Sequence, residues 1–192
     1  MSAKTRKVRL RNPARRQLHR CFLRWLKENA VRMQVPLVIE SRTDRIIRCS
    51  FAGHTRALEM TLSHDIGIHV LHDGEWWDSL EFFEAWPIAR HPGYICGFCK
   101  PEYQTTYPSR QALWEDHMFE PFLSWVNETL TTHAWLMLGQ TDGGGILWAE
   151  LHSEKKPNEI GHYRWIPLLS GRTSAVESGE RTVCLELARR VE

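Results

Sequence analysis

Two cysteines and two histidines near the middle of the chain have the types and the spacing of a metal site. Cys96 and Cys99 are separated by two residues, one of them glycine, so both thiolates can face a single ion. His117 follows Cys99 by eighteen residues, and His91 precedes Cys96 by five. Because tetrahedral zinc takes four ligands, we predict a structural zinc ion bound by Cys96, Cys99, His117 and His91.

Other interpretations of this segment stay open. Asp116 or Glu120 could supply the fourth ligand in place of His91. The two cysteines could remain reduced thiols, as free cysteines often do. They could also form a redox pair, although the βαβ pattern expected around such a motif is missing from the sequence. We do not expect a catalytic zinc, because such a site keeps one ligand position open beside a general base.

Motifs of known enzymes are absent from the sequence. It contains no nucleophile elbow, no phosphate-binding loop and no dinucleotide fingerprint. The glycines at 143–145 connect two predicted strands, so we predict a hairpin turn there. We therefore expect a protein that is not an enzyme. The alternative is a metal-dependent nuclease or hydrolase that uses Asp142, Glu150 and nearby histidines such as His152.

Basic residues are concentrated at the start of the chain. Residues 1–32 contain eleven Lys or Arg and one acidic residue, whereas residues 33–192 contain fourteen Lys or Arg and twenty-two acidic residues. This asymmetry predicts an arm and a helix face that neutralise the phosphates of a nucleic acid or a ribonucleoprotein. A solvated basic face without a partner is the alternative. The predicted contact residues are Lys4, Arg6, Lys7, Arg9, Arg11, Arg15, Arg16, Arg20 and Arg24.

A second segment, residues 73–86, is both acidic and aromatic. It contains five acidic residues, five aromatic residues and no basic residue. From Ser79 onward we predict a short helix that covers the core. Aromatic side chains left uncovered would form a partner-binding surface, because exposed aromatic area usually marks an interface. The predicted residues of that surface are Trp76, Trp77, Phe82 and Trp86.

Hydrophobic periodicity predicts two copies of one element order. A long helix starts at Pro13 with Asn12 as its N-cap. A second helix starts after Ser109, which can cap it. Four short strands are predicted after each helix. Their ranges are 35–40, 45–51, 55–62 and 66–72, and then 133–138, 146–151, 162–168 and 182–188.

We therefore predict an α+β fold with two similar lobes, each a long helix followed by an antiparallel β-meander, joined by the Cys-x-x-Cys segment. The two helices align at an offset of 100 residues, which suggests an internal duplication. Two unrelated amphipathic helices would also match in part, so that alternative stays open. The predicted units are a basic arm (1–12), a first lobe (13–75), a junction (76–108) and a second lobe (109–192).

The composition of the chain is typical of a soluble globular protein. The chain has 192 residues, of which 42% are hydrophobic and 25% are charged, as in an ordinary soluble domain. No apolar run is long enough to span a membrane, and the basic start of the chain lacks the apolar core of a secretory signal. We expect a cytoplasmic protein without a membrane partner and without disulfides.

Residues 107–128, following the Cys-x-x-Cys motif, resemble a family of uncharacterised proteins carried on bacterial mobile elements. The resemblance covers about residues 86–150 and implies an accessory role on a plasmid or phage. It transfers no catalytic residue. We thus expect a non-enzymatic mobile-element protein that binds a nucleic acid or ribonucleoprotein, for example as an inhibitor of a host defence complex such as a CRISPR effector. A zinc-stapled DNA-binding regulator is the second hypothesis.

Overall fold

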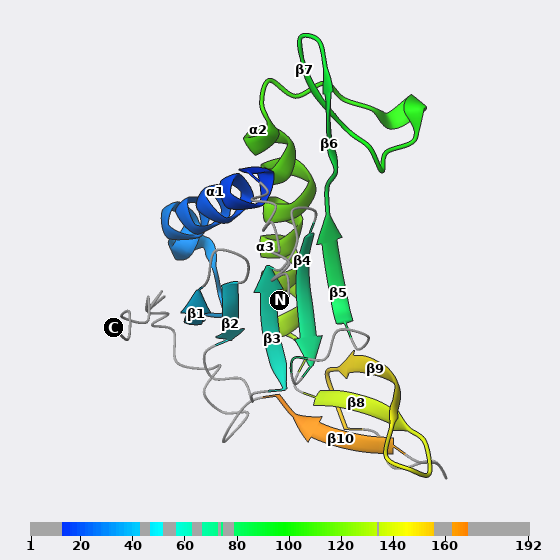
Figure 1. Ribbon diagram of the computed structural model, residues 1–192. Coiled ribbons are helices and arrows are strands. Elements are labelled where there is room, and N and C mark those ends of the chain that lie inside the picture. The colour runs from blue at the N-terminus through cyan, green and yellow to red at the C-terminus, as the bar shows by residue number, and fades with distance from the viewer. Residues whose placement is uncertain are drawn as a thin grey trace, which may run out of the picture.

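The computed structural model describes residues 13–42, 47–51, 57–62, 67–72, 74, 79–133, 135–155 and 163–168, with the backbone alone at 13–15 and 41–42. The fold is α+β, with two helical segments and antiparallel sheets, as predicted (Figure 1). Among the described residues, no helix has both the length and the apolar character that a bilayer crossing requires.

Helix α1 (Pro13–Asn29) is amphipathic and begins at the predicted residue. Its apolar side chains recur at helical spacing, and Leu18, Phe22 and Leu26 are fully buried. A single 3-10 turn, η1 (Ala30–Arg32), follows α1 and leads the chain into the first sheet. The predicted N-cap, Asn12, lies outside the described residues.

The main sheet has five antiparallel strands in sequence order, β1-β2-β3-β4-β5. Their bounds are β1 (Leu37–Arg42), β2 (Ile47–Phe51), β3 (Leu58–Leu62), β4 (Gly67–His72) and β5 (Ser79–Glu84). The first four confirm the predicted strands. In β2 and β3 apolar and polar residues alternate, which places one face of the sheet in the core, since successive side chains of a strand point to opposite faces.

The fifth strand corrects the predicted helix after Ser79. β5 pairs with β4, and its neighbouring aromatic residues point to opposite faces of the sheet. Phe83 turns toward the core and packs edge-on against Phe122, whereas Phe82 stacks on His69 at a ring distance of 4.1 Å. Aromatic residues fit strands well, and the pairing with β4 decides between two locally acceptable conformations.

The second helical segment runs without interruption from Arg110 to Leu130. It comprises α2 (Arg110–Trp114), a π turn η4 (Glu115–Phe119), α3 (Glu120–Trp125) and a second π turn η5 (Val126–Leu130). The predicted cap is confirmed, because the hydroxyl of Ser109 accepts a hydrogen bond from the backbone N–H of Ala112 at 3.1 Å.

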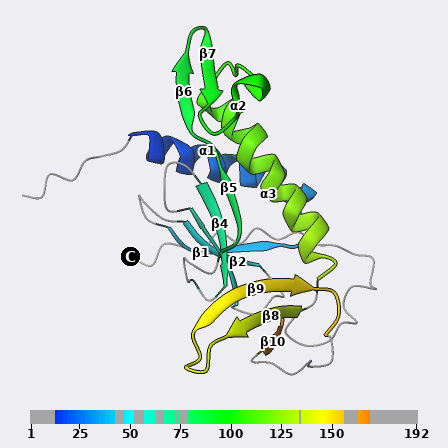
Figure 2. The same ribbon diagram turned by 90° about the vertical axis from the view of Figure 1, so that its right-hand side faces the viewer.

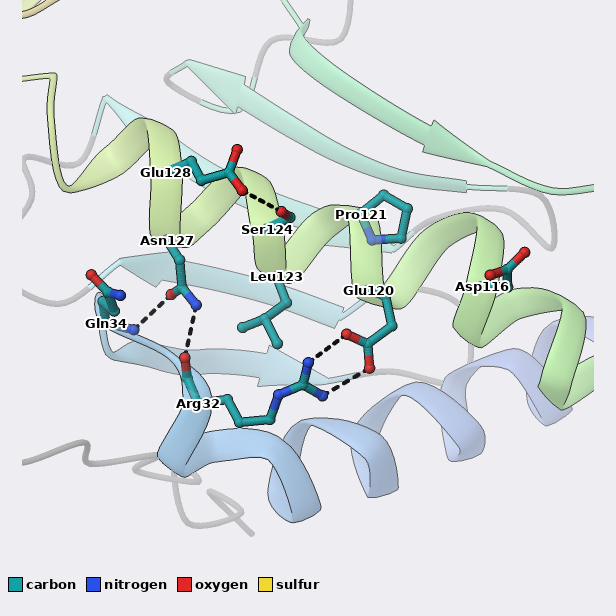
Figure 3. A pocket seen from close by; sticks show the side chains of 9 residues that line it. All are labelled: Arg32, Gln34, Asp116, Glu120, Pro121, Leu123, Ser124, Asn127 and Glu128. Carbon is teal, nitrogen blue, oxygen red and sulfur yellow. Dashed lines mark hydrogen bonds and ion pairs between the residues drawn. The ribbon is translucent and has the colours of Figure 1, made fainter.

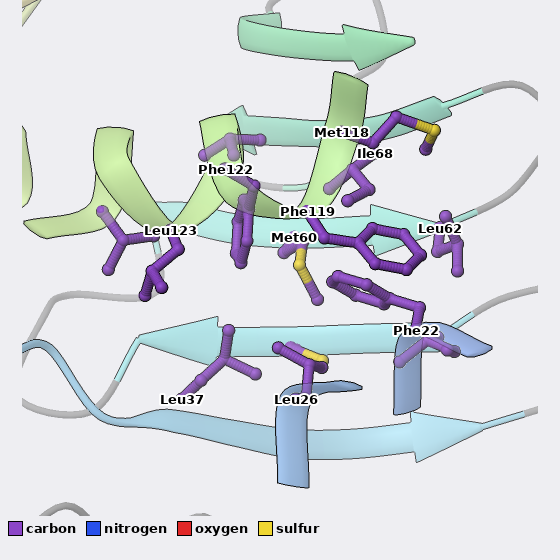
Figure 4. Close-up of a cluster of buried hydrophobic side chains, with 14 of the residues drawn as sticks. Phe22, Leu26, Leu37, Met60, Leu62, Ile68, Met118, Phe119, Phe122 and Leu123 are labelled. Carbon is purple, nitrogen blue, oxygen red and sulfur yellow. The ribbon is translucent and has the colours of Figure 1, made fainter. Parts of the chain in front are cut away.

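Both helical segments cover the same face of the main sheet and share one core (Figure 4). Phe22 of α1 lies 5.0 Å from Phe119 of η4, measured between ring centroids. Phe122 of α3 lies 5.9 Å from Phe22 and 6.5 Å from Phe51 of β2. The second helix therefore completes the core of the first sheet and does not start a separate core.

A smaller sheet of three strands lies at the end of the molecule opposite the hairpin of β6 (Pro87–Arg90) and β7 (Gly93–Cys96) (Figure 2). Its strands are β8 (Trp135–Gln140), β9 (Ile146–His152) and β10 (Tyr163–Pro167). The predicted turn between β8 and β9 is confirmed, with the N–H of Thr141 donating to the carbonyl of Gly145 at 2.8 Å.

The order of this sheet, β10-β8-β9, is not that of a meander. β10 returns to pair with β8, whereas each strand of the main sheet pairs with the next along the chain. This difference and the shared core leave the predicted two-lobe duplication unconfirmed. The last predicted strand, 182–188, lies outside the described residues.

Candidate metal centre

A short hairpin carries the two cysteines away from the main sheet. It consists of β6 (Pro87–Arg90) and β7 (Gly93–Cys96), so that Cys96 is the last residue of β7. The chain then turns tightly, with the N–H of Cys99 3.4 Å from the carbonyl of Cys96. A Cβ at Gly97 would lie 2.9 Å from side-chain carbons of both Trp86 and Ile88, so these side chains would have to shift to admit a larger residue in this turn.

The third candidate ligand, His117, comes from the second helical segment. His117 lies in the π turn η4, a local widening that often occurs at functional sites. One possible ligand atom from each of Cys96, Cys99 and His117 lies within 4.8 Å of the other two. Ligands of a tetrahedral zinc ion are about 3.5–3.8 Å apart, given zinc–ligand bonds of about 2.0–2.3 Å. A small inward movement would therefore bring the three onto one ion.

The chemistry of these three donors suits zinc. Thiolate sulfur and imidazole nitrogen are its preferred ligands in proteins, whereas calcium and magnesium take oxygen. Cys96 is buried and Cys99 is half-buried, and neither is in a disulfide. Burial raises the pKa of the Cys99 thiol, and a hydrogen bond with Cys96 raises it further. Metal binding would therefore release protons from these thiols.

A tyrosine that the sequence analysis did not single out lies against His117. The hydroxyl oxygen of Tyr107 is 3.0 Å from Nε2 of His117 and 2.5 Å from Oδ2 of Asp116, to which it donates. The Tyr107 and His117 rings meet edge to face at 5.5 Å. Burial, followed by the hydrogen bond to Asp116, raises the pKa of Tyr107 to about 12, so its hydroxyl keeps its proton at neutral pH.

The backbone of Tyr107 is fixed to the hairpin that carries Cys96. Tyr94 of β7 and Tyr107 exchange two backbone hydrogen bonds, of 2.9 and 2.7 Å. The backbone at Tyr107 runs so close to β7 that a Cβ at Gly93 would lie 2.0 Å from the carbonyl oxygen of Tyr107. This bridge couples the hairpin to the tyrosine that contacts His117.

His91 and Glu120 are not placed to serve as the fourth ligand, and Asp116 does not belong to the group of ligand atoms within 4.8 Å of one another. His91 follows β6 at the tip of the hairpin, beyond the Arg90–Gly93 pair, whereas Cys96 is at its base. That separation exceeds about 10 Å along the strands, which corrects the prediction for His91. Glu120 binds Arg32, and Asp116 accepts the Tyr107 hydroxyl.

A groove lies close to the candidate metal centre, and several of the polar side chains that line it bind one another (Figure 3). It has a volume of about 620 Å³ and lies between η1 and α3. Arg32 makes two hydrogen bonds, of 2.8 and 2.6 Å, to the carboxylate of Glu120. The side chain of Asn127 accepts from the N–H of Gln34 and donates to the carbonyl of Arg32, both at 2.8 Å. These contacts fasten η1 and the residues that follow it to α3 and η5.

The predicted basic residues that the structure describes form a row on α1. Arg16, Arg20 and Arg24 are exposed and follow one another at intervals of four residues, and Lys27 extends the row. Within the described ranges, no ion pair involves any of these four side chains. The remaining predicted contacts lie outside the described residues or side chains. They are Lys4, Arg6, Lys7, Arg9, Arg11 and Arg15.

The predicted partner-binding surface is placed in part. Phe82 is 37% exposed and Trp86 is 46% exposed, while Trp76 and Trp77 lie outside the described residues. Trp86 is joined by two side chains that the sequence analysis missed. Ile88 and Phe98 are 43% and 52% exposed, and Ile88 shares with Trp86 the contact around the glycine of the cysteine turn.

The residues of the nuclease hypothesis do not converge. Asp142 is in the β8–β9 turn, whereas Glu150 is four residues further along β9 than Ile146, the first residue of that strand. Oε2 of Glu150 lies within hydrogen-bond distance, 3.2 Å, of Nε2 of His152. Among the described residues, the only histidine, cysteine or carboxylate side chains grouped closely enough for a metal are those of Cys96, Cys99 and His117.

Comparison with known proteins returned no match, whether to protein-family models, to curated proteins or to solved structures.

Proposed function

We propose that this chain is a non-enzymatic binding protein that contacts the phosphate backbone of a nucleic acid, free or within a ribonucleoprotein, through the exposed face of α1. One observation carries the proposal: Arg16, Arg20, Arg24 and Lys27 form a single exposed row without carboxylate partners among the described residues. Phosphate contacts supply most of the affinity in sequence-independent nucleic-acid binding.

Because α1 is packed against the core, the row of basic residues on its outer face has a fixed position. The opposite face of the helix contributes Leu18, Phe22 and Leu26 to the core, so the helix cannot turn its basic residues away. From Arg16 to Lys27 the row extends over roughly 16 Å, at 1.5 Å per helical residue. That length is enough to follow several phosphates of one strand.

Zinc would have a structural role in this protein. We propose that it binds Cys96, Cys99 and His117 and thereby ties the β6–β7 hairpin to the second helix. Two cysteine sulfurs and one imidazole nitrogen within 4.8 Å of one another support this assignment. The ion would stabilise the hairpin without taking part in a reaction.

A second candidate function is the occlusion of a protein partner, such as a host defence complex, by a mobile-element protein. The exposed apolar side chains of Trp86, Ile88 and Phe98 around the cysteine turn support it. Contiguous exposed apolar side chains commonly mark an interface. In this case the zinc would hold the apolar surface in shape, and the basic row would only accelerate association.

The test compares two variants with the same change in net charge. The first replaces the basic row by glutamine, as Arg16→Gln, Arg20→Gln, Arg24→Gln and Lys27→Gln. The control replaces four exposed basic residues elsewhere, as Arg90→Gln, Lys100→Gln, Lys155→Gln and Arg164→Gln. Binding of fluorescent duplex and single-stranded oligonucleotides is measured for both variants and for the wild type at low salt.

We expect the variant of the basic row to lose at least tenfold in affinity and the control to lose much less. Equal losses in the two variants would reduce the effect to net charge and contradict the proposal. No binding by the wild type at low salt would also contradict it and leave the occlusion of a protein partner as the better hypothesis.

A further inference from the structure

We propose that Tyr107 and Asp116 select the tautomer of His117, so that the imidazole binds the metal through Nδ1 and keeps its proton on Nε2. This inference rests on the zinc site proposed above. It adds two positioning residues that the metal itself does not contact, and it states which of the two ring nitrogens is the ligand.

The direction of the hydrogen bonds determines the tautomer. The Tyr107 hydroxyl has one proton, which it donates to Oδ2 of Asp116 at 2.5 Å. Toward His117 the same hydroxyl oxygen can then only accept. Since Nε2 lies 3.0 Å from that oxygen, Nε2 must donate and therefore carries a proton.

The other nitrogen, Nδ1, then carries the free lone pair. A neutral imidazole has one protonated and one unprotonated nitrogen, and only the unprotonated one binds a metal. An ion bound to Nε2 at about 2.1 Å would lie on the side where the Tyr107 oxygen is 3.0 Å away. It would have to displace that hydroxyl or take it as a ligand. Binding through Nδ1 leaves the whole hydrogen-bond chain intact.

The tyrosine is held where this role requires it. Its backbone bridges to Tyr94 on the strand that ends at Cys96, and its ring meets His117 edge to face. The hydroxyl thus reaches the helix from the hairpin that carries the cysteines. A hydrogen bond on the second nitrogen of a metal-bound histidine orients the ring, and its loss commonly lowers metal affinity about 10–100-fold.

The test has two readouts on the full-length, zinc-loaded protein. Long-range ¹H–¹⁵N correlation spectra of ¹⁵N-histidine-labelled protein report which nitrogen of His117 binds zinc and which carries the proton. Competition with a chromophoric chelator gives the zinc affinity of the wild type, Tyr107→Phe and Asp116→Asn. Tyr103→Phe is the matched control, because it removes the same hydroxyl from a side chain that is 74% exposed.

We expect zinc on Nδ1 with a proton on Nε2 in the wild type. We also expect a 10–100-fold loss of affinity in Tyr107→Phe, a smaller loss in Asp116→Asn and none in Tyr103→Phe. The conservative phenylalanine keeps the ring packing, and the melting temperature of the metal-free variant checks this.

Tight zinc binding through Nε2 would overturn the inference and leave the metal site standing. An unchanged affinity in Tyr107→Phe would do the same. A wild-type protein that binds no zinc would overturn the metal site and this inference together.

Discussion

Replacing Phe122 by alanine tests whether the molecule has one core or two. Phe122 is fully buried in α3, and its ring lies 5.9 Å from Phe22 of α1, 6.5 Å from Phe51 of β2 and 5.9 Å from Phe83 of β5. It therefore joins the second helix to three elements of the first half of the chain. Deleting a buried phenylalanine side chain costs about 3–5 kcal/mol, as lost burial and a cavity.

For a protein of this length, a loss of about 3–5 kcal/mol corresponds to a fall of roughly 6–20 °C in the melting temperature. Calorimetry and circular dichroism should show that fall in a single transition. Phe98→Ala is the control, because the same side chain is 52% exposed there and its removal should change little. Two separate transitions, with Phe122→Ala lowering only one of them, would refute the single core.

Three further predictions concern the metal centre and the thiols. Zinc at a hundredfold excess over its dissociation constant should stabilise the protein by about 2.7 kcal/mol and thus raise its melting temperature. This rise should disappear in Cys99→Ser, and an equal rise in that variant would contradict the site. Gly93→Ala should weaken zinc binding, because its Cβ would collide with the carbonyl of Tyr107, and an unchanged affinity in chelator competition would show that the bridge does not position the site. Burial raises the pKa of the Cys49 thiol well above its ordinary value, so mass spectrometry after alkylation at pH 8 should find Cys49 modified only in denaturant, while native modification would contradict its burial.

Local sequence patterns predicted most of the elements correctly. The strands β2 and β3 alternate apolar and polar residues, and both helices carry apolar residues at helical spacing. The cap at Ser109 and the glycine turn between β8 and β9 are equally local. Each of these features depends on residues only a few positions apart, which is why the sequence sufficed.

The features that the sequence did not predict depend on distant partners. Phe82 and Phe83 fit a helix or a strand, and only pairing with β4 makes the segment a strand. An apolar helix face likewise does not reveal which sheet it covers, so the second helix was assigned to a lobe of its own. The role of Tyr107 arises from a backbone bridge to Tyr94, thirteen residues earlier, which leaves no spacing signal.

The candidate metal site was predicted in part for the same reason. The two cysteines form one turn, so their spacing alone places them together. His117 was found because histidine is a common zinc ligand within reach along the chain. His91 is close in sequence, but the hairpin carries it to the opposite end of β7.

The central claim is that the basic row on α1 binds phosphates, and the salt dependence of binding tests it most directly. Affinity for a DNA duplex is measured from 50 to 200 mM salt for the wild type and for the variant that carries glutamine at Arg16, Arg20, Arg24 and Lys27. Four phosphate contacts contribute about 3.6 to the slope of log affinity against log salt, or roughly 150-fold across this range. We predict that the slope of the variant is shallower by about that amount. Parallel lines for the two proteins would contradict the claim, because the four side chains would then release no counterions.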